Sequence, residues 1–275
     1  MSANPKSINT GRNLPLATAV GLGLLAAVIA SLYFDRWFFA ALAAIAGFIS
    51  ARELLNLLRS RGALIDKISL PLFVAAMILF AYGQGLRGAL VMGALGLIVA
   101  WAVRLKDGVA GYTADITGSA FIILYVGAGI SFAADLANHP NGFGRVLTII
   151  LLTAGNDTGG YFAGILAGKH PMVPRISPKK TWEGFVGSVA LQSLVGIFIV
   201  PLLLPVAWYQ GLLLSLLMTV TATIGDLMES AIKRDAGAKD SGDIIPGHGG
   251  MLDRIDGMLI NSPMAWVVLT IVLGV

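Results

Sequence analysis

Cysteine is absent from this 275-residue sequence, charged residues make up only 12% of it, and histidine occurs three times. Without cysteine the chain forms no disulfide bond and offers no thiolate to a metal ion. His139, His170 and His248 are far apart in the sequence, so a histidine zinc site is not expected either. A soluble domain carries about 25% charged residues, so the scarcity of charge excludes an ordinary soluble fold. The modest net charge of +4 gives no reason to expect a nucleic-acid partner.

Apolar residues are abundant instead, at 56% of the chain. Runs of about 20 apolar residues cross a bilayer as helices. The sequence therefore predicts an all-α, polytopic integral membrane protein with about nine transmembrane helices. A signal peptide is the alternative for the first run, but that run is longer than the roughly 7–15-residue core of a signal. The predicted helix cores are 14–34, 37–58, 68–86, 88–103, 114–135, 144–167, 185–205, 207–229 and 257–275.

The placement of lysine and arginine predicts the orientation. With nine crossings, all but three of the 19 cations fall on the side of the N-terminus, and the exceptions are Arg36, Arg87 and Arg145. Cations favour cytoplasmic loops. We therefore expect a cytoplasmic N-terminus, an external C-terminus, and cytoplasmic loops at 168–184 and 230–256.

The polar residues gather in the second half of the chain, at one membrane face. This pattern predicts two parts: 1–143 with the first five spans, and a catalytic part, 144–275, with the last four spans and both polar loops. No repeat or linker divides the chain further.

Three acidic residues, Asp157, Asp226 and Glu229, fall inside or at the ends of apolar spans. A carboxylate at mid-bilayer costs roughly 2.5–3.5 kcal/mol, so such a group normally faces protein or a water-filled cavity. Asp226, Glu229, Ser230 and Lys233 share one helical face at i, i+3, i+4 and i+7. Glu229 is expected to pair with Lys233. Asp226 has no cation at i+4 and is the better candidate for a metal ligand.

Asp253 and Asp256 occupy the first turns of the last span, after the glycine-rich GHGG segment 247–250. Acids at a helix N-terminus also stabilise the helix dipole, by about 0.3–1 kcal/mol. That simpler role explains Asp256 as well as ligand binding does, whereas we favour metal ligation for Asp253. The oxygen ligands predict a hard cation such as Mg²⁺, which is usually held by one or two carboxylates together with substrate phosphates.

A second polar stretch covers 155–184. Asn156 and Asp157 lie among glycines that permit close helix packing in membranes. Ser177 and Pro178 fit the N-cap and first residue of a helix, which places Lys179 and Lys180 in its first turn. Cations oppose the dipole there, and a bound phosphate would explain them. The alternative is that both lysines only anchor the cytoplasmic face.

The segment 230–256, SAIKRDAGAKDSGDIIPGHGGMLDRID, resembles the signature of the phosphatidate cytidylyltransferases, also called CDP-diacylglycerol synthases. The upstream ISPKKTWEG segment and the GD pair at 225–226 are similar to the family as well. The resemblance covers about 155–257. The matching signature residues are Ser230, Lys233, Arg234, Lys239, Asp240, Gly247, His248, Gly249, Gly250, Asp253, Arg254 and Asp256.

The resemblance implies that the chain makes CDP-diacylglycerol and pyrophosphate from CTP and phosphatidate, with membrane lipids around it. It implies that Asp226 and Asp253 hold Mg²⁺, with a monovalent cation such as K⁺ beside it in some members. It also implies a homodimer in a bacterial inner (plasma) membrane, with the active site facing the cytoplasm. The nucleophile is the lipid phosphate itself, so no side-chain nucleophile is expected.

We assign catalysis to Asp226, Asp253, Lys233 and Arg234. The expected substrate-binding residues are Asn156, Asp157, Lys179, Lys180, Ser230, Lys239, Asp240, His248, Gly249, Gly250, Arg254 and Asp256. Two alternatives stay open from the residues alone. One is a related lipid enzyme, either a CTP-dependent lipid alcohol kinase of the dolichol or phytol type or a cytidylyltransferase acting on an ether lipid. The other is an ion-coupled membrane transporter.

Overall fold

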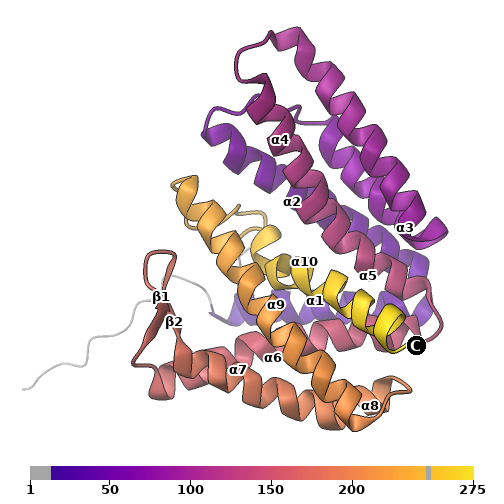
Figure 1. The fold of residues 1–275 in the computed structure, drawn as a ribbon, viewed down its shortest axis with the longest axis vertical. Helices are drawn as coiled ribbons and strands as arrows, with labels where there is room; N and C mark the ends of the chain where they lie inside the picture. The colour runs from indigo at the N-terminus through magenta and orange to yellow at the C-terminus, as the bar shows by residue number, and fades with distance from the viewer. Residues whose placement is uncertain (1–13, 246–248) are drawn as a thin grey trace, which may run out of the picture.

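The computed structural model describes residues 14–245 and 249–275, and these are helical almost throughout (Figure 1). Three π-helical segments, η2 (Ile123–Ala128), η3 (Val195–Ile199) and η4 (Val267–Val272), continue neighbouring α-helices. The α-helices are α1 (Leu14–Phe34), α2 (Arg36–Ser60), α3 (Ser69–Arg104), α4 (Tyr112–Ile122), α5 (Gly129–Asn138), α6 (Gly142–Ala167), α7 (Trp182–Leu194), α8 (Val200–Leu203), α9 (Trp208–Asp235) and α10 (Leu252–Trp266).

Within the described ranges, six helical stretches are long and apolar enough to cross a bilayer. Large apolar side chains also face outward, with Leu166 83% and Leu202 80% exposed. Extensive exposed apolar surface is unfavourable in water and is expected where lipid surrounds a protein. The prediction of an all-α integral membrane protein is confirmed, with six candidate membrane-spanning stretches in the described ranges. The count of nine crossings and the orientation of the termini stay predictions.

Helix α3 contains a reversal of the chain at Gly85, which has φ 70° and ψ −171°. A Cβ atom built on Gly96 would lie 2.6 Å from Phe73 Cβ, and one on Gly93 would lie 3.1 Å from Met77 Sδ. These contacts require the two halves of α3 to pack side by side. The positive φ explains why glycine stands at the turn. The predicted separation of segments 68–86 and 88–103 is therefore present.

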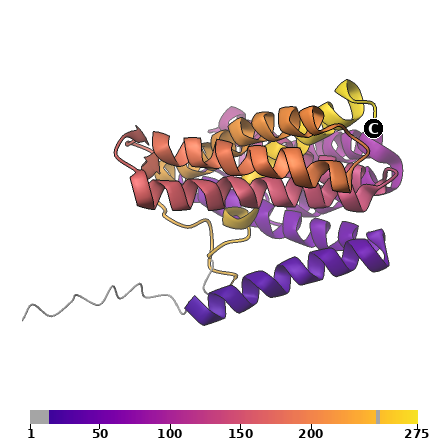
Figure 2. The ribbon, with the colours of Figure 1, turned by 90° about the horizontal axis from the view of Figure 1, so that it is seen from below.

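The helices form two packed groups with α9 and α10 between them (Figure 1). One core contains residues of α2, α3, α4 and α5, and α10 adds Leu252 and Leu259 to it. The other core contains residues of α6, α8 and α9, with Ala265 of α10. Helix α1 lies along one outer side, next to α2 (Figure 2). Helix α10 thus belongs to both groups, which places its N-terminal acids at their junction.

The loop after α6 corrects one prediction, because Ser177 and Pro178 do not start a helix. They begin β2 (Ser177–Thr181), which pairs antiparallel with β1 (Pro171–Val173). A residue before proline disfavours the helical region, which suits an extended strand. The N-cap of α7 is Thr181, whose Oγ1 accepts a hydrogen bond from Gly184 N at 3.1 Å. Lys179 and Lys180 therefore lie on a hairpin strand, and the helix-dipole argument for them is wrong.

The fold-back at Gly85 predicts a disulfide in a Phe73→Cys, Gly96→Cys double variant. The chain has no other cysteine. The two Cβ atoms lie close enough for a disulfide after a small shift toward the usual ~3.8 Å. In one continuous helix the same residues would be about 34 Å apart.

Mild oxidation should therefore protect both thiols from maleimide labelling in the monomer. A Phe73→Cys, Leu95→Cys pair is the control, because Leu95 is 43% exposed and faces outward. Full labelling of the 73/96 pair after oxidation would rule out the hairpin.

Candidate functional site

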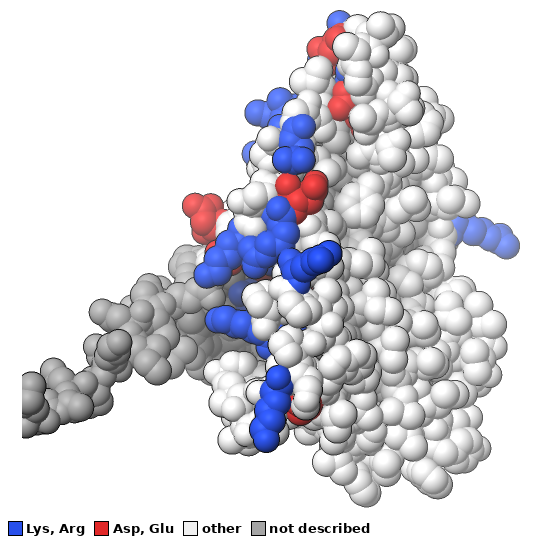
Figure 3. Space-filling view, turned by 60° about the vertical axis from the view of Figure 1, so that its left-hand side comes forward, with Lys and Arg blue, Asp and Glu red and all other residues white. Residues whose placement is uncertain are grey.

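Lysine and arginine gather along one edge of the molecule, and the surface beyond that edge carries little charge (Figure 3). The ends of α2 and α9 and the loop after α9 supply exposed cations, among them Arg61, Arg234 and Lys239. The sites described below are built at the C-terminal ends of α6 and α9 and the N-terminal end of α10.

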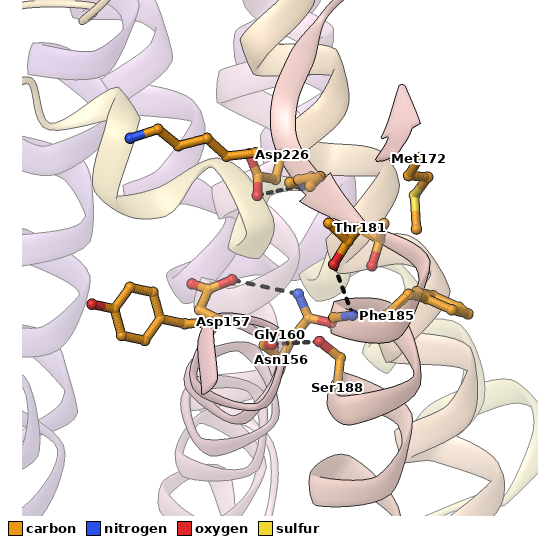
Figure 4. Close-up of a pocket in the computed structure, with 13 residues that line it drawn as sticks. Asn156, Asp157, Gly160, Met172, Thr181, Phe185, Ser188 and Asp226 are labelled. Carbon is orange, nitrogen blue, oxygen red and sulfur yellow. Dashed lines mark hydrogen bonds and ion pairs between the residues drawn. The ribbon is translucent and has the colours of Figure 1, made fainter. Parts of the chain in front are cut away.

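A pocket of about 290 Å³ opens between α6, the β1–β2 hairpin, α7 and α9 (Figure 4). Five of the predicted residues line it: Asn156, Asp157, Lys179, Lys180 and Asp226. The Nζ atom of Lys180 makes an ion pair with Oδ2 of Asp226. The pocket therefore combines an acidic floor with lysines carried by the hairpin, and it joins the two polar segments of the sequence.

Asn156 presents an unused hydrogen-bond acceptor beside this pocket. Its carbonyl O accepts from Ser188 Oγ at 2.6 Å, and its Nδ2 donates to Asp157 Oδ1 at 3.4 Å. Its Oδ1 is buried and has no partner within the described ranges. A buried polar atom without a partner costs about 1–3 kcal/mol. Asn156 Oδ1 is thus available to a ligand.

The packing of α6 against α7 brings these residues close. A Cβ atom on Gly159 would lie 2.6 Å from Gly187 O, and one on Gly160 would lie 2.9 Å from Ser188 Oγ. The predicted role of these α6 glycines in close helix packing is confirmed at these two positions.

Lys233 joins α9 to α10. Its Nζ lies 2.5 Å from Glu229 Oε2 and 2.7 Å from Asp253 Oδ1. The side chains are buried, at 13% exposure for Lys233, 1% for Glu229 and 7% for Asp253. The predicted pairing of Glu229 with Lys233 is confirmed. Asp253 is a second partner, so one ammonium holds two carboxylates from different helices.

Asp253 also fixes the glycine-rich segment that precedes it. Its Oδ2 accepts hydrogen bonds from Ser241 N and Ser241 Oγ at 3.0 Å each, and from Gly250 N at 2.9 Å. Gly249 has φ 83°, and a Cβ atom there would lie 3.1 Å from the same oxygen. Glycine is needed because the backbone approaches the carboxylate closely in a left-handed conformation.

Glu53 on α2 is a site residue that our sequence analysis missed. It is 3% exposed, and its carboxylate accepts from Leu252 N at 2.7 Å, Met251 N at 3.0 Å and Ser241 Oγ at 3.2 Å. It therefore caps the N-terminus of α10, which has no cap from its own N-cap side chain. An acid inside the second apolar span was the available signal, by the same rule that identified Asp157.

Tyr125 is a second residue from the first half that was missed. It lies in the π-helical segment η2, is 5% exposed, and its hydroxyl has no hydrogen-bond partner in the parts of the chain described. The segment η2 contacts α10, the helix that carries Asp253 and Asp256. π-Helical segments often occur at functional sites. Nothing in the sequence around Tyr125 marks it as polar-facing.

Asp256 lies where α10 packs against α9, since a Cβ atom on Gly225 would lie 3.0 Å from Asp256 O. Its Oδ1 accepts from Gly257 N at 2.7 Å. The backbone of Asp256 is therefore next to Gly225, the residue before Asp226.

Other predicted residues lie further out. Arg234 is exposed and donates from Nη1 to Ala238 O at 3.2 Å. Lys239, Asp240 and Arg254 are exposed as well, and Ser230 is half-buried in α9. Gly247 and His248 lie outside the described residues.

The donor set fits a hard cation. The ligand atoms that Asp226, Asp253 and Asn156 would present are oxygens, which Mg²⁺ prefers. In this structure Asp253 Oδ1 pairs with Lys233, and its Oδ2 accepts from Ser241 and Gly250, so a metal at Asp253 has to displace Lys233. Within residues 14–245 and 249–275, no three His, Asp or Glu side chains are grouped closely enough to hold a metal by themselves. A site with one or two protein carboxylates, completed by substrate phosphates and water, agrees with both observations.

Comparisons with known proteins identify the family of the chain. The model of the cytidylyltransferase family matches residues 16–272. The phosphatidate cytidylyltransferase of Mycobacterium leprae is 36% identical over 95% of this chain and 89% of its own length. That of Mycobacterium bovis is 38% identical over 95% and 90%. The phosphatidate cytidylyltransferase of Bacillus subtilis is 35% identical over 64% of this chain and 65% of its own length.

The contacts of Glu53 predict that Glu53→Ala loosens segment 241–252. The change leaves two buried backbone N–H groups of the α10 N-terminus without a partner, at about 1–3 kcal/mol each. We expect a lower midpoint of thermal unfolding and faster tryptic cleavage after Lys239 and Arg254. Glu183→Gln is the control, because Glu183 contacts the other polar loop, at Lys169 and His170. An unchanged cleavage rate in Glu53→Ala would contradict the capping role.

Proposed function

This chain belongs to the cytidylyltransferase family and transfers the cytidylyl group of CTP to phosphatidate, and we propose that the Lys180–Asp226 pocket and the adjoining Lys233–Asp253 cluster form its active site. The main support for this active site is that two polar segments far apart in the sequence meet there. Their lysines and carboxylates alternate at the ends of three helices. The family membership favours this reaction over the lipid kinase and transporter alternatives.

The reaction joins two polyanions. A phosphate oxygen of phosphatidate forms a bond to the α-phosphorus of CTP, and the bond from that phosphorus to the bridging oxygen of the β-phosphate breaks, which releases pyrophosphate. The nucleophile is already anionic near neutral pH, so the protein has to position the substrates and stabilise charge. We assign this to Lys179 and Lys180 on the hairpin, to Lys233 between α9 and α10, and to Arg234, Lys239 and Arg254 nearer the surface.

Asp226 and Asp253 would hold Mg²⁺, whose chemistry is to neutralise the phosphates and the leaving pyrophosphate. In this structure each carboxylate pairs with a lysine, Asp226 with Lys180 and Asp253 with Lys233. Both positions therefore attract a cation. Asn156, Asp157 and Asp256, with Gly249 and Gly250, complete the proposed lining around the substrates. The predicted substrate contact of His248 lies outside the described residues. A monovalent cation such as K⁺ is proposed on the resemblance alone.

We further propose nine crossings, with the active site at the cytoplasmic face of a bacterial inner membrane, and a homodimer. The gathering of cations at one edge supports the orientation (Figure 3). The division at residue 143 stays a prediction, although Glu53 and Tyr125 reach the site from the first half.

The metal assignment predicts that Asp226→Asn and Asp253→Asn each abolish CDP-diacylglycerol synthesis while expression and membrane insertion persist. The assay uses purified protein with phosphatidate and CTP labelled at the α-phosphate, with and without Mg²⁺, and chromatography of the lipid product. A cytidylyltransferase transfers the α-phosphate of CTP to the lipid, whereas a kinase transfers the γ-phosphate. Lipid labelled from α-labelled CTP but not from γ-labelled CTP therefore separates the two enzymes. Asp243→Asn is the control because Asp243 is exposed. Near-normal turnover in either active-site variant at ordinary Mg²⁺ would remove that residue from the metal site.

The position of Lys180 predicts that Lys180→Gln lowers kcat/KM by about 10²-fold, the usual loss for one positioned charge-stabilising donor. Lys169→Gln is the matched control, because Lys169 is exposed at the same loop and does not line the pocket. Equal kinetics in the two variants would show that Lys180 only neutralises Asp226.

A further inference from the structure

A second cavity, of about 520 Å³, lies at the opposite end of α6 and α10 from the active site. It is lined by His139 and Asn141 before α6, Arg145 in the first turn of α6, Leu204 after α8, and Thr270 near the C-terminus. Along α6, residue 145 is about 18 Å from residue 157, and along the last helix residue 270 is about 21 Å from residue 256. The cavity therefore faces the other side of the membrane.

Arg145 is the unusual residue in this cavity. It is 6% exposed, its Nε donates to Pro140 O at 3.1 Å, and its Nη1 is buried without a hydrogen-bond partner in the described ranges. A guanidinium has five N–H donors and stays charged at any physiological pH. A buried charged donor without a partner is strongly unfavourable, so the free Nη1 needs an acceptor.

No residue in the described ranges 14–245 and 249–275 supplies that acceptor. Asp135 is the acid that attracts Arg145 electrostatically, but its Oδ2 accepts from Trp266 Nε1 at 2.6 Å and lies 3.7 Å from His139 Nδ1. Among the described residues Asp135 and Arg145 form no ion pair. Arg36 adds a second cation nearby, donating to the carbonyls of Ala137 and His139 at 3.1 Å. The start of α6 adds the positive end of a helix dipole.

We propose that this cavity binds a phosphate ester anion, with Arg145 as its charged donor. A guanidinium matches the oxygen geometry of phosphate and binds it with two parallel hydrogen bonds. Asn141 Nδ2 donates one N–H to Leu203 O at 2.6 Å and has a second N–H for a ligand, and Leu204 offers an apolar wall. The hydroxyl of Thr270 donates to Trp266 O, so Arg145 is the main donor to the anion. The phosphate belongs either to an anionic lipid of that leaflet or to a free phosphate compound. The site is separate from the CTP and phosphatidate pocket, and its existence does not depend on the proposed active site.

Native mass spectrometry of the full chain, released from nanodiscs of phosphatidylcholine with or without phosphatidylglycerol, tests this site. We expect a retained phosphatidylglycerol adduct in the wild type and in Arg87→Gln, and an about tenfold or larger rise of its Kd in Arg145→Gln. Arg87 is a matched control because it is exposed and predicted on the same membrane side. Arg145→Lys keeps the positive charge, so its affinity for phosphatidylglycerol should fall less than that of Arg145→Gln. Equal phosphatidylglycerol binding in Arg145→Gln and Arg87→Gln, together with no Arg145-dependent response to inorganic phosphate, would overturn the proposal.

Inorganic phosphate, titrated against the wild type in phosphatidylcholine alone, distinguishes the two sources. An Arg145-dependent rise in the midpoint of thermal unfolding with phosphate, and no selectivity for phosphatidylglycerol, assigns the site to a soluble anion. No response to either probe overturns the proposal.

A measurement on unmodified protein covers the case in which Arg145→Gln does not fold. Phosphatidylglycerol with a photoactivatable group near its headgroup should label peptides containing 139–145 or 270–275. Labelling confined to peptides around 156 and 226 would assign all lipid binding to the active site and refute a second one.

Discussion

The ion pairs of Lys233 with Glu229 and Asp253 are the interaction on which the rest of the site depends. One buried ammonium holds carboxylates from α9 and α10 at 2.5 and 2.7 Å, and the second oxygen of Asp253 binds the backbone of the segment between these helices. Removing one partner of a buried pair leaves an uncompensated charge, which typically costs 3–5 kcal/mol. The loop, the junction of the helices and the position of the acids are thus fixed together.

The site has more carboxylates than a stable apolar core would tolerate. Asp157 and Asp226 line one pocket, and Lys180 reaches Asp226 from outside the helices, on a hairpin. Carboxylates that lie close together favour the binding of cations, and lysines that pair with acids are ready to exchange toward phosphates. This combination suits an enzyme that brings a nucleoside triphosphate to an anionic lipid.

The sequence predicted those parts of the molecule that follow from local rules. Apolar runs and helical spacing correctly identified the helices and the face shared by Asp226 and Lys233. The predicted helix start at Ser177 was wrong because a Ser-Pro pair fits both a helix start and a strand, and the tertiary context decided for the hairpin strand. Glu53 was missed although an acid inside an apolar span was a signal for it. Tyr125 was missed because contacts across more than a hundred residues leave no periodic signal.

The contact between Glu53 and Leu252 also constrains how the protein is made. Chains emerge from the ribosome N-terminus first. Glu53 therefore enters the membrane with α2 long before α10 has been synthesised, and its carboxylate has no backbone donors from Met251 and Leu252 until the last helix is inserted. Such a late, long-range closure is slow to form. The nascent N-terminal helices therefore contain an acid without these donors until synthesis of the chain is almost complete.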